Sequence, residues 1–428
     1  MRAAFYECDI TPPLGGFMWG HYSDLRAEDV YEKLYAKAVV VEDSGELAAI
    51  VVVDTCALTE EMHDVVTKRI YEYTGITPDR VCITSNHTHS GAPIASDYPI
   101  KCFADETYKD VFYRLCADAV TLAYKRLGDV DAKFGTTEVH GISFNRNFEL
   151  TDGRFVTHGR GKTNIVRALD GIDPALPVLM FERDGKPIGA IINFACHQCC
   201  LGNYNGYSGD YASVMAQKLK EHYGSDFISL FVLGTCGDIN HVDPNKAADP
   251  PCWYREMGRI LADAVVRAAN DAQPVSGGVK VVKETVEIAR RMATAEDIMN
   301  LRTRPSNLES EWMQSLKLRN LMYYREVNDR DTSELYVQSI RIGDVCITAL
   351  PGEIYSAYGL AIKANSPFKR AMVVENCNSY CGYVPTKQAF APNSEIYEST
   401  LCFHSNLVPE AGDILQAKAL EQAEYLSY

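Results

Sequence analysis

The feature that most constrains the fold of this chain is a series of short apolar runs that each end abruptly in polar residues. Such runs are typical of buried strands. In α/β sheets the loops that leave the carboxyl ends of strands form the ligand crevice, so we expect these polar ends to converge on one site. The runs and their polar ends occupy residues 81–91, 190–198, 230–240, 345–353 and 371–378.

The order of strand-like and helix-like segments predicts an α/β fold with a large mixed central sheet flanked by helices. Turn residues at 43–45, 184–185 and 343–344 indicate hairpins, so antiparallel strands are expected in the sheet. The segment through residue 16 is predicted to be a loop. Strands are predicted at residues 35–41, 47–53, 80–84, 133–139, 178–182, 188–194, 228–233, 279–288, 336–342, 345–349 and 371–374. Helices are predicted at residues 59–75, 105–127, 210–223, 253–269, 294–325, 354–365 and 410–425.

The chain of 428 residues is long enough for one large domain, and no Pro-, Gly- or Ser-rich linker divides it. We therefore predict a single catalytic-type domain over residues 1–428. The polar, helix-rich stretch at residues 293–331 is predicted to be a helical insertion. No internal sequence repeat is evident.

The formal net charge of −15 argues against a nucleic-acid partner and against binding to an anionic membrane. The longest apolar run, residues 47–53, is too short to cross a bilayer, so no transmembrane segment is expected. The first nine residues include acidic side chains where a secretory signal would be apolar. These features predict a soluble, cytoplasmic protein whose fourteen cysteines are free thiols.

His87 and His89 are separated by one residue, so in an extended segment both side chains leave the same face. His197 ends a second buried run, and Glu353 follows a third. A catalytic zinc site typically has three protein ligands and one open position, and zinc accepts both imidazole and carboxylate. The sequence therefore predicts one bound zinc ion, with the three histidines and Glu353 as candidate ligands.

The cysteines around His197 offer a different metal site. Residues 196–200 read Cys-His-Gln-Cys-Cys, which could contribute to a thiolate-rich structural zinc site. Such a site needs a second CxxC or CxxH pair at knuckle spacing, and none stands out in the sequence. We therefore expect these cysteines to be free thiols.

Several motifs occur in a fixed order along the chain. They are Asp-Ile-Thr-Pro at residues 9–12, Met-Trp-Gly at 18–20, Asn-His-Thr-His-Ser-Gly at 86–91, Phe-Asn-Arg at 144–146, Phe-Ala-Cys-His at 194–197, Leu-Pro-Gly-Glu at 350–353, Ser-Tyr-Cys-Gly-Tyr-Val at 379–384 and Tyr-Glu-Ser-Thr at 397–400. As an ordered set, these motifs resemble the catalytic domain of the neutral (alkaline, non-lysosomal) ceramidases, zinc amidases that cleave the N-acyl bond of sphingolipids. The resemblance extends from residue 1 to about residue 410.

The resemblance assigns roles to individual residues. It implies that the zinc ligands are His87, His197, Glu353 and Tyr383. It also implies that the reacting carbonyl group is lined by His89, Arg146 and Tyr397. Under this assignment His89 is an oxyanion donor together with Tyr397, rather than a zinc ligand. Arg146 either anchors a polar or anionic part of the substrate or forms a structural ion pair.

Two departures from the family pattern affect the expected mechanism. The family places its nucleophilic serine in a Gly-Asp-Val-Ser-Pro motif, whereas residues 237–240 read Gly-Asp-Ile-Asn here. Asn240 cannot form a covalent intermediate, so metal-activated water is expected to attack, with Asn240 positioning water or substrate. Cys236 is the nearest alternative nucleophile, and Asp238 is either a ligand, an orienter of an imidazole or a turn residue.

The second departure is length. Relatives in this family continue into a C-terminal β-sandwich domain and are mostly exported, and neither property is expected for this chain. A small soluble amide or ester is therefore favoured over a membrane sphingolipid as the substrate.

Three functions remain open from the sequence. The leading one is a zinc-dependent hydrolase of an amide (N-acyl) or ester bond. A two-metal phosphoesterase would instead use a larger ligand set, namely His87, His89, His197, Asp238 and Asp54. A catalytically degenerate relative, suggested by Asn240, would bind a ligand without turnover. The oligomeric state is not determined by the sequence.

Overall fold

Three mixed sheets form the body of the molecule, and they share the same order of four strands. The computed structural model describes residues 1–428 except residues 22, 98, 100, 203 and 304–310. In each sheet, three strands form an antiparallel meander, and a helix then carries the chain to a fourth strand that pairs in parallel with the last meander strand. The sequence shows no such repeat, because the repeat is one of topology.

The bounds of the strands follow the order of the three sheets. The first sheet has the order β5-β4-β3-β1-β6 and contains β1 (Arg2–Asp9), β3 (Tyr35–Asp43), β4 (Glu46–Val53), β5 (Val81–Ser85) and β6 (Gly128–Asp129). The second has the order β15-β13-β12-β7-β17 and contains β7 (Asp131–Glu138), β12 (Ala175–Arg183), β13 (Lys186–Phe194), β15 (Ile228–Leu233) and β17 (Gln273–Pro274). The third has the order β18-β19-β20-β22 and contains β18 (Val279–Ala289), β19 (Thr332–Ile342), β20 (Val345–Ala349) and β22 (Arg370–Val374).

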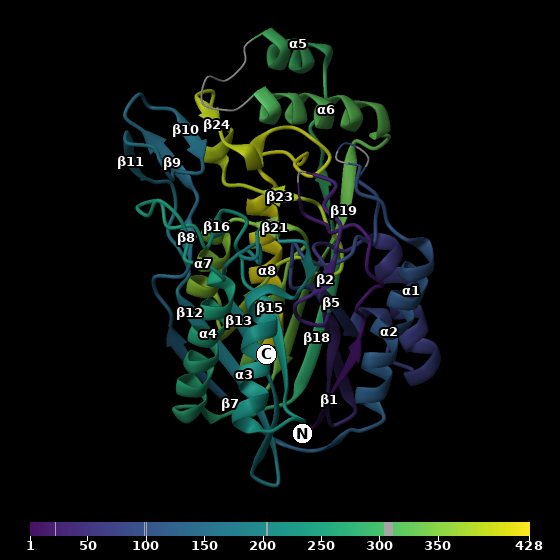
Figure 1. The fold of residues 1–428 in the computed structure, drawn as a ribbon. Helices are drawn as coiled ribbons and strands as arrows, with labels where there is room; N and C mark the ends of the chain where they lie inside the picture. The colour runs from purple at the N-terminus through teal and green to yellow at the C-terminus, as the bar shows by residue number, and fades with distance from the viewer. Residues whose placement is uncertain (22, 98, 100, 203, 304–310) are drawn as a thin grey trace.

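Each sheet is covered on its outer face by a pair of helices. Figure 1 shows the first pair on one side of the body and the second pair on the other. The first sheet packs against α1 (Glu60–Thr74) and α2 (Glu106–Tyr124). The second packs against α3 (Asp210–Tyr223) and α4 (Trp253–Asn270). The third packs against α7 (Ser356–Asn365) and α8 (Ala411–Ser427).

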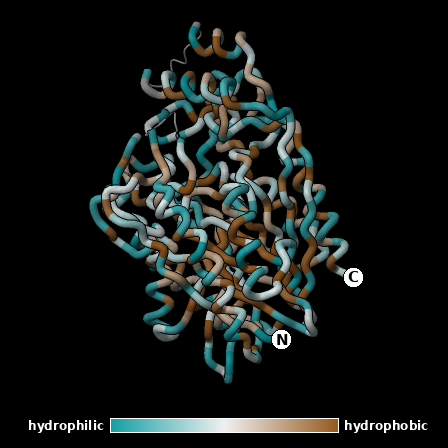
Figure 2. Tube along the Cα trace, turned by 90° about the vertical axis from the view of Figure 1, so that its right-hand side faces the viewer, coloured by the Kyte–Doolittle hydropathy of each residue, from teal (hydrophilic) through white to brown (hydrophobic). Residues whose placement is uncertain are grey.

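The inner faces of the three sheets share one apolar core. In β3, Val39 and Val41 face this core, whereas Ala38 and Val40 face the helices, because successive side chains of a strand point to opposite faces. Complete burial of a valine side chain contributes about 1.5–3 kcal/mol to the free energy of unfolding. In a strand that is buried on both faces, the side chains on each face make this contribution. Figure 2 shows hydrophobic segments running through the interior and hydrophilic segments at the surface.

Short ladders and helices gather around the carboxyl ends of the parallel strands. The ladders join β2 (Asp29–Val30) to β14 (Gly206–Tyr207), β8 (Phe144–Asn145) to β16 (Ile239–Asn240), and β21 (Glu353–Ile354) to β23 (Tyr383–Val384). A further sheet has the order β11-β9-β10-β24 and contains β9 (Asn147–Leu150), β10 (Phe155–Thr157), β11 (Ile165–Ala168) and β24 (Ser394–Glu395). Three 3-10 turns are η1 (Pro78–Arg80), η2 (Lys387–Phe390) and η3 (Tyr397–Ser399). Two helices of the insertion, α5 (Ala295–Thr303) and α6 (Glu311–Val327), lie above this end of the body in Figure 1.

The predicted fold class is confirmed: the chain forms a mixed α/β domain with helices over its sheets. The expected large central sheet is divided into the three sheets that enclose the shared core. The predicted bounds of the helix at residues 59–75 are also confirmed, because Thr59 caps α1 by accepting a hydrogen bond from the Met62 amide and Gly75 ends it in a left-handed conformation.

Two predictions need correction. The loop predicted through residue 16 is wrong for residues 2–9, which form β1 in the first sheet. This segment has no β-branched residue, so its composition does not indicate a strand. The single helix predicted at residues 294–325 is represented by α5 and α6, and its middle part, residues 304–310, lies outside the described residues.

No helix in the described part of the chain is both long and apolar enough to span a membrane. All fourteen cysteines are present as free thiols. The cytoplasmic location stays a prediction.

Candidate metal centre

Each of the three sheets contributes one side chain to a buried cluster of possible metal ligands. His87 follows β5, His197 follows β13 and Glu353 follows β20. The distance from His197 Nε2 is 3.1 Å to His87 Nε2 and 3.1 Å to Glu353 Oε2, and His87 Nε2 lies 3.4 Å from Glu353 Oε2. Tetrahedral zinc with bonds of about 2.0–2.1 Å places its ligand atoms about 3.3 Å apart. The spacing and the donor types of this cluster therefore fit zinc.

Hydrogen bonds fix the orientation of each of these side chains. His87 Nδ1 lies 2.5 Å from the Cys56 carbonyl oxygen, and His197 Nδ1 lies 2.8 Å from the Cys236 carbonyl oxygen. A carbonyl partner requires a proton on Nδ1, so the Nε2 atoms of both rings face the cluster. The Tyr380 hydroxyl donates to Glu353 Oε1 over 2.6 Å. Glu353 Oε2 accepts no other hydrogen bond from the described residues, so it is available to a metal.

The electrostatics of the cluster also suit a cation. Burial would raise the pKa of Glu353, but His87 and His197 hold that pKa well below its ordinary value, so the carboxyl group is ionised. Burial, and then the charge of Arg146, lower the pKa of His197 to about 4. His197 is therefore a neutral imidazole at pH 7, which is the form that binds zinc.

The backbone at this end of the sheets is held in uncommon conformations. His87 is buried and has φ of 63°, which is rare for a residue other than glycine and costs energy that the surrounding packing must offset. Gly20 has φ of 91°, and a Cβ atom there would lie 2.7 Å from Cγ of His89. The glycine of the Met-Trp-Gly motif is therefore required for the close approach of the backbone to the His89 ring.

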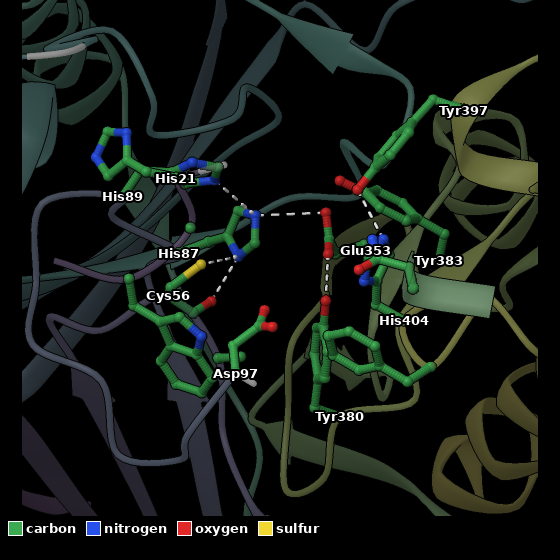
Figure 3. A pocket seen from close by; sticks show the side chains of 15 residues that line it. His21, Cys56, His87, His89, Asp97, Glu353, Tyr380, Tyr383, Tyr397 and His404 are labelled. Carbon is green, nitrogen blue, oxygen red and sulfur yellow. Dashed lines mark hydrogen bonds and ion pairs between the residues drawn. The ribbon is translucent and has the colours of Figure 1, made fainter. Parts of the chain in front are cut away.

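The cluster opens into a cavity of about 100 Å³. Figure 3 shows His87 and Glu353 facing each other across it, with Tyr380, Tyr383, Tyr397 and His404 on the side of Glu353. Its described lining residues are Trp19, Gly20, His21, Cys56, Ala57, His87, His89, Asp97, Asn320, Glu353, Tyr380, Tyr383, Tyr397, Phe403 and His404. Of the residues predicted from the sequence, the cavity thus exposes His87, Glu353, His89, Tyr383 and Tyr397 to a ligand.

His89 lies beside the cluster and is suited to a hydrogen-bonding role. Its Nε2 atom is 3.3 Å from His87 Nε2. Burial lowers the pKa of His89 well below its ordinary value, and the neighbouring His87 and His197 lower it further, so the ring is neutral. A second possible donor group, formed by Cys56, His87 and His89, shares His87 with the first and so competes with it for the same imidazole.

Tyr397 is held in place by a residue that the sequence analysis did not single out. Its hydroxyl lies 2.7 Å from Nε2 of His404, and both side chains line the cavity. Burial lowers the pKa of His404 to about 4, so a neutral imidazole faces the hydroxyl. The pair fixes the Tyr397 hydroxyl at the cavity wall.

Arg146 is not among the described residues that line the cavity. Its Nε lies 2.6 Å from Glu398 Oε1, and its Nη2 donates to the Gly237 carbonyl oxygen over 2.7 Å. Nη2 also lies 3.3 Å from the Tyr383 hydroxyl. The guanidinium is thus buried in a structural ion pair, and among the described lining residues of the cavity it contacts Tyr383, so we find no direct access for an anionic substrate group.

Asn240 and Asp238 are both engaged in local structure. The Asn240 Oδ1 atom accepts the Val242 amide over 2.9 Å, as expected for a turn asparagine. Asp238 accepts the Ser356 amide over 2.7 Å and the Asn145 side chain over 2.6 Å. None of these lies among the described lining residues of the cavity.

Cys236 is buried with its Sγ atom 3.1 Å from Glu375 Oε1. Burial and the Glu375 carboxyl group raise the pKa of the Cys236 thiol well above its ordinary value, so it is a poor nucleophile. Asp54 accepts the Tyr35 amide over 2.7 Å and the Asn86 side chain over 2.6 Å. Its carboxylate therefore supports the strand ends and does not join the described metal-ligand groups.

Residues 196–200 do not gather into a thiolate site in the described structure. Cys196 contacts the Ile142 carbonyl oxygen, and Cys199 lies 3.9 Å from His241 Nδ1. The expectation of free thiols at these positions agrees with this placement.

The residues that the sequence analysis passed over are mostly close to its motifs. Tyr380 lies inside the motif at residues 379–384, and Glu398 lies inside the motif at residues 397–400, so the signal was present. Asp97, Asn320 and His404 carry no local pattern, and only the folded chain brings them to the cavity.

Comparisons with known proteins agree with this architecture. The family model described as neutral/alkaline non-lysosomal ceramidase, N-terminal, matches residues 6–333. Neutral ceramidase A of Dictyostelium discoideum is 27% identical over 233 residues, which are 51% of this chain and 32% of that protein. The match thus spans about a third of the length of this curated relative.

Solved structures share the fold. The crystal structure of neutral ceramidase from Pseudomonas aeruginosa has a TM-score of 0.77 at 18% identity and covers 99% of this chain and 74% of that one. A ceramidase complexed with C2 has a TM-score of 0.77 at 19% identity and covers 100% of this chain and 75% of that one. These likenesses concern the fold, and function must be argued from the site itself.

Proposed function

Because the chain belongs to the neutral/alkaline non-lysosomal ceramidase family, we propose that it is a zinc-dependent hydrolase of an amide (N-acyl) or ester bond. The observation that carries this proposal is the buried triad of His87, His197 and Glu353, whose donor atoms have the separations of a tetrahedral zinc site. We assign Tyr383 as the fourth ligand, since β23 pairs it in register with Glu353 and it lines the cavity.

A zinc ion held there would polarise the scissile carbonyl and lower the pKa of a water molecule, which supplies the attacking group that Asn240 cannot. The protein residues around it bind and orient the substrate. His89 and Tyr397 lie on the cavity wall where neutral donors can stabilise a carbonyl oxygen that gains negative charge. His404 holds the Tyr397 hydroxyl, and Tyr380 holds the Glu353 carboxylate.

In this proposal Arg146 does not contact the substrate and acts through Tyr383. Its charge is balanced by Glu398, and its Nη2 atom donates to the Tyr383 hydroxyl and so fixes the position of that phenol. We therefore treat Arg146 as a positioning residue for Tyr383 and not as a substrate anchor.

The test combines metal content with turnover. Native mass spectrometry of the zinc-loaded chain should give one zinc ion per chain, and a panel of N-acyl amides, short-chain N-acyl sphingosines and esters should include hydrolysed members. His197→Ala should lose both the zinc ion and the activity. His140→Ala is the matched control, since His140 is exposed and pairs with Glu138 away from the cavity. Full activity in His197→Ala would refute the proposal.

The attacking group can be tested separately. Intact-mass measurement during turnover should detect no acylated chain, because Cys236 is buried as a neutral thiol and Asn240 is not a nucleophile. An acylated peptide in the digest would overturn direct attack by water. Two zinc ions per chain with phosphoester hydrolysis would favour the phosphoesterase instead, although Asp54 and Asp238 are directed to other partners.

A further inference from the structure

The cavity beside the metal triad carries a second kind of chemistry, which the hydrolytic proposal does not use. Its described lining residues include the aromatic rings of Trp19, Tyr380 and Phe403 in addition to those of Tyr383 and Tyr397. Two others present hydrogen-bond acceptors, Asp97 and Asn320. Figure 3 shows the Asp97 side chain directed into the space between Cys56 and Tyr380. Rings together with acceptors are the usual surroundings of a bound ammonium group.

The charges around the cavity favour a cation over an anion. Among its described lining residues the charged side chains are Asp97 and Glu353, with no lysine or arginine. The Arg146 guanidinium, which contacts the Tyr383 hydroxyl, is paired with Glu398 outside the described lining. The net charge of −15 on the chain also attracts cations over longer distances.

Asn320 provides an independent observation. It lies on α6, is only 4% exposed, and its Oδ1 atom has no hydrogen-bond partner in the described structure. A buried acceptor without a donor costs about 1–3 kcal/mol, so a ligand that supplies an N–H group there gains this energy. A primary ammonium group has three N–H donors and can serve two acceptors at once.

We propose that the substrate of this hydrolase is an amide or ester that carries a primary ammonium group at its other end. Asp97 and Asn320 receive the ammonium group among the rings of Trp19 and Tyr380, while the scissile carbonyl lies at the metal triad. The substrate class rests on the proposed hydrolytic function, but binding of the ammonium group does not. The two acceptors need N–H donors. They therefore favour a primary ammonium group over a quaternary one, which has no N–H group.

This assignment gives helix α6 a role in substrate binding. Asn320 belongs to α6, so α6 forms part of the cavity wall where the ammonium group would bind rather than the part that holds the metal.

The test uses the zinc-loaded protein and four N-acetyl amides of equal length. Their free ends are a primary ammonium, a trimethylammonium, a methyl and a carboxylate group. The primary ammonium compound should have a kcat/KM about 10- to 100-fold above the methyl compound, as expected for one charge-assisted hydrogen bond. The trimethylammonium and carboxylate compounds should be poorer than the primary ammonium compound.

Asp97→Asn should reduce the preference for ammonium over methyl to nearly one. Asp105→Asn is the matched control: it removes one negative charge from the same loop, keeps the oxygen that caps α2 and does not line this cavity, so the preference should be retained. Equal loss in Asp105→Asn would mean that long-range charge, not contact with Asp97, sets the preference. Asn320→Leu should lower the rate of the ammonium compound more than that of the methyl compound.

Binding separates this inference from the proposed function. An alkylammonium ion should bind to the zinc-loaded protein by calorimetry, and Asp97→Asn should weaken this binding about 10-fold or more. If no amide is hydrolysed but this weakening is observed, the ammonium site stands and the hydrolytic proposal falls. If the methyl and ammonium compounds are hydrolysed equally and Asp97→Asn changes neither binding nor preference, the inference is overturned and the hydrolase stands.

Discussion

Replacement of Glu375 by leucine should weaken metal binding although Glu375 is not a ligand. Glu375 follows β22, and its Oε2 atom accepts the Ile354 amide over 2.8 Å and the Cys236 amide over 3.0 Å. Ile354 is the neighbour of the ligand Glu353, and the Cys236 carbonyl oxygen orients the ligand His197. The Glu375 carboxyl group is thus hydrogen-bonded to the backbone segments that position two metal ligands, and these ligands follow strands of different sheets.

The size of the effect follows from these contacts. Leucine leaves two buried amide groups without an acceptor, at about 1–3 kcal/mol each, so the free energy of unfolding should fall by about 2–6 kcal/mol. Loss of a partner that orients a ligand typically weakens metal affinity about 10- to 100-fold. Burial raises the pKa of Glu375 to about 8, so the group is largely protonated at pH 7 and glutamine should replace it with little loss.

The assay is a zinc competition titration with a chromophoric chelator, accompanied by urea unfolding of the metal-free protein. Glu375→Gln serves as the matched control, because it keeps an acceptor for both amide groups. Wild-type zinc affinity in Glu375→Leu would refute the reasoning. Equal losses in both variants would show that the hydrogen-bond acceptor is not the cause.

Further predictions concern the histidines. Burial and the charge of Lys283 lower the pKa of His63 to about 4, so the stability that its neutral form contributes is complete above pH 6.5 and is lost as the pH falls through 4. Lys283→Met should therefore raise the NMR titration midpoint of His63. Lys280→Met is the control and should leave this midpoint unchanged, because Lys280 lies on the same strand as Lys283 but packs over the ring of Tyr425. Gly20→Ala should displace the His89 ring and reduce turnover while zinc stoichiometry stays at the wild-type value; unchanged turnover would contradict the oxyanion role.

Much of the fold could be predicted because its signals are local. The β-branched runs in β3 and β4 and the Asp43–Gly45 turn predicted the hairpin, and Thr59 and Gly75 predicted the ends of α1. The strand β1 escaped prediction because Arg2–Asp9 lacks β-branched residues and is stabilised by its partner β3 in the folded sheet.

The candidate site divides in the same way. The positions of His87, His197 and Glu353 at strand ends were visible in the sequence, because an apolar run followed by polar residues is a local pattern. Whether Arg146 reaches the substrate was not visible, because its partner Glu398 lies 252 positions later in the chain. Nor was the turn role of Asn240 distinguishable from a catalytic one before its hydrogen bond was located.

The sequence by itself determined the α/β class, the approximate bounds of most helices and of most long strands, and the residue types available for a metal, since periodicity, turn residues and motifs depend on near neighbours. Only the tertiary structure decided that three topologically equivalent sheets each deliver one donor to a single point. It also decided that Asp97 and Asn320 face the resulting cavity. The reason is physical: a metal centre needs donor atoms about 3.3 Å apart, and residues hundreds of positions apart reach that distance only through the packing of the sheets around their shared core.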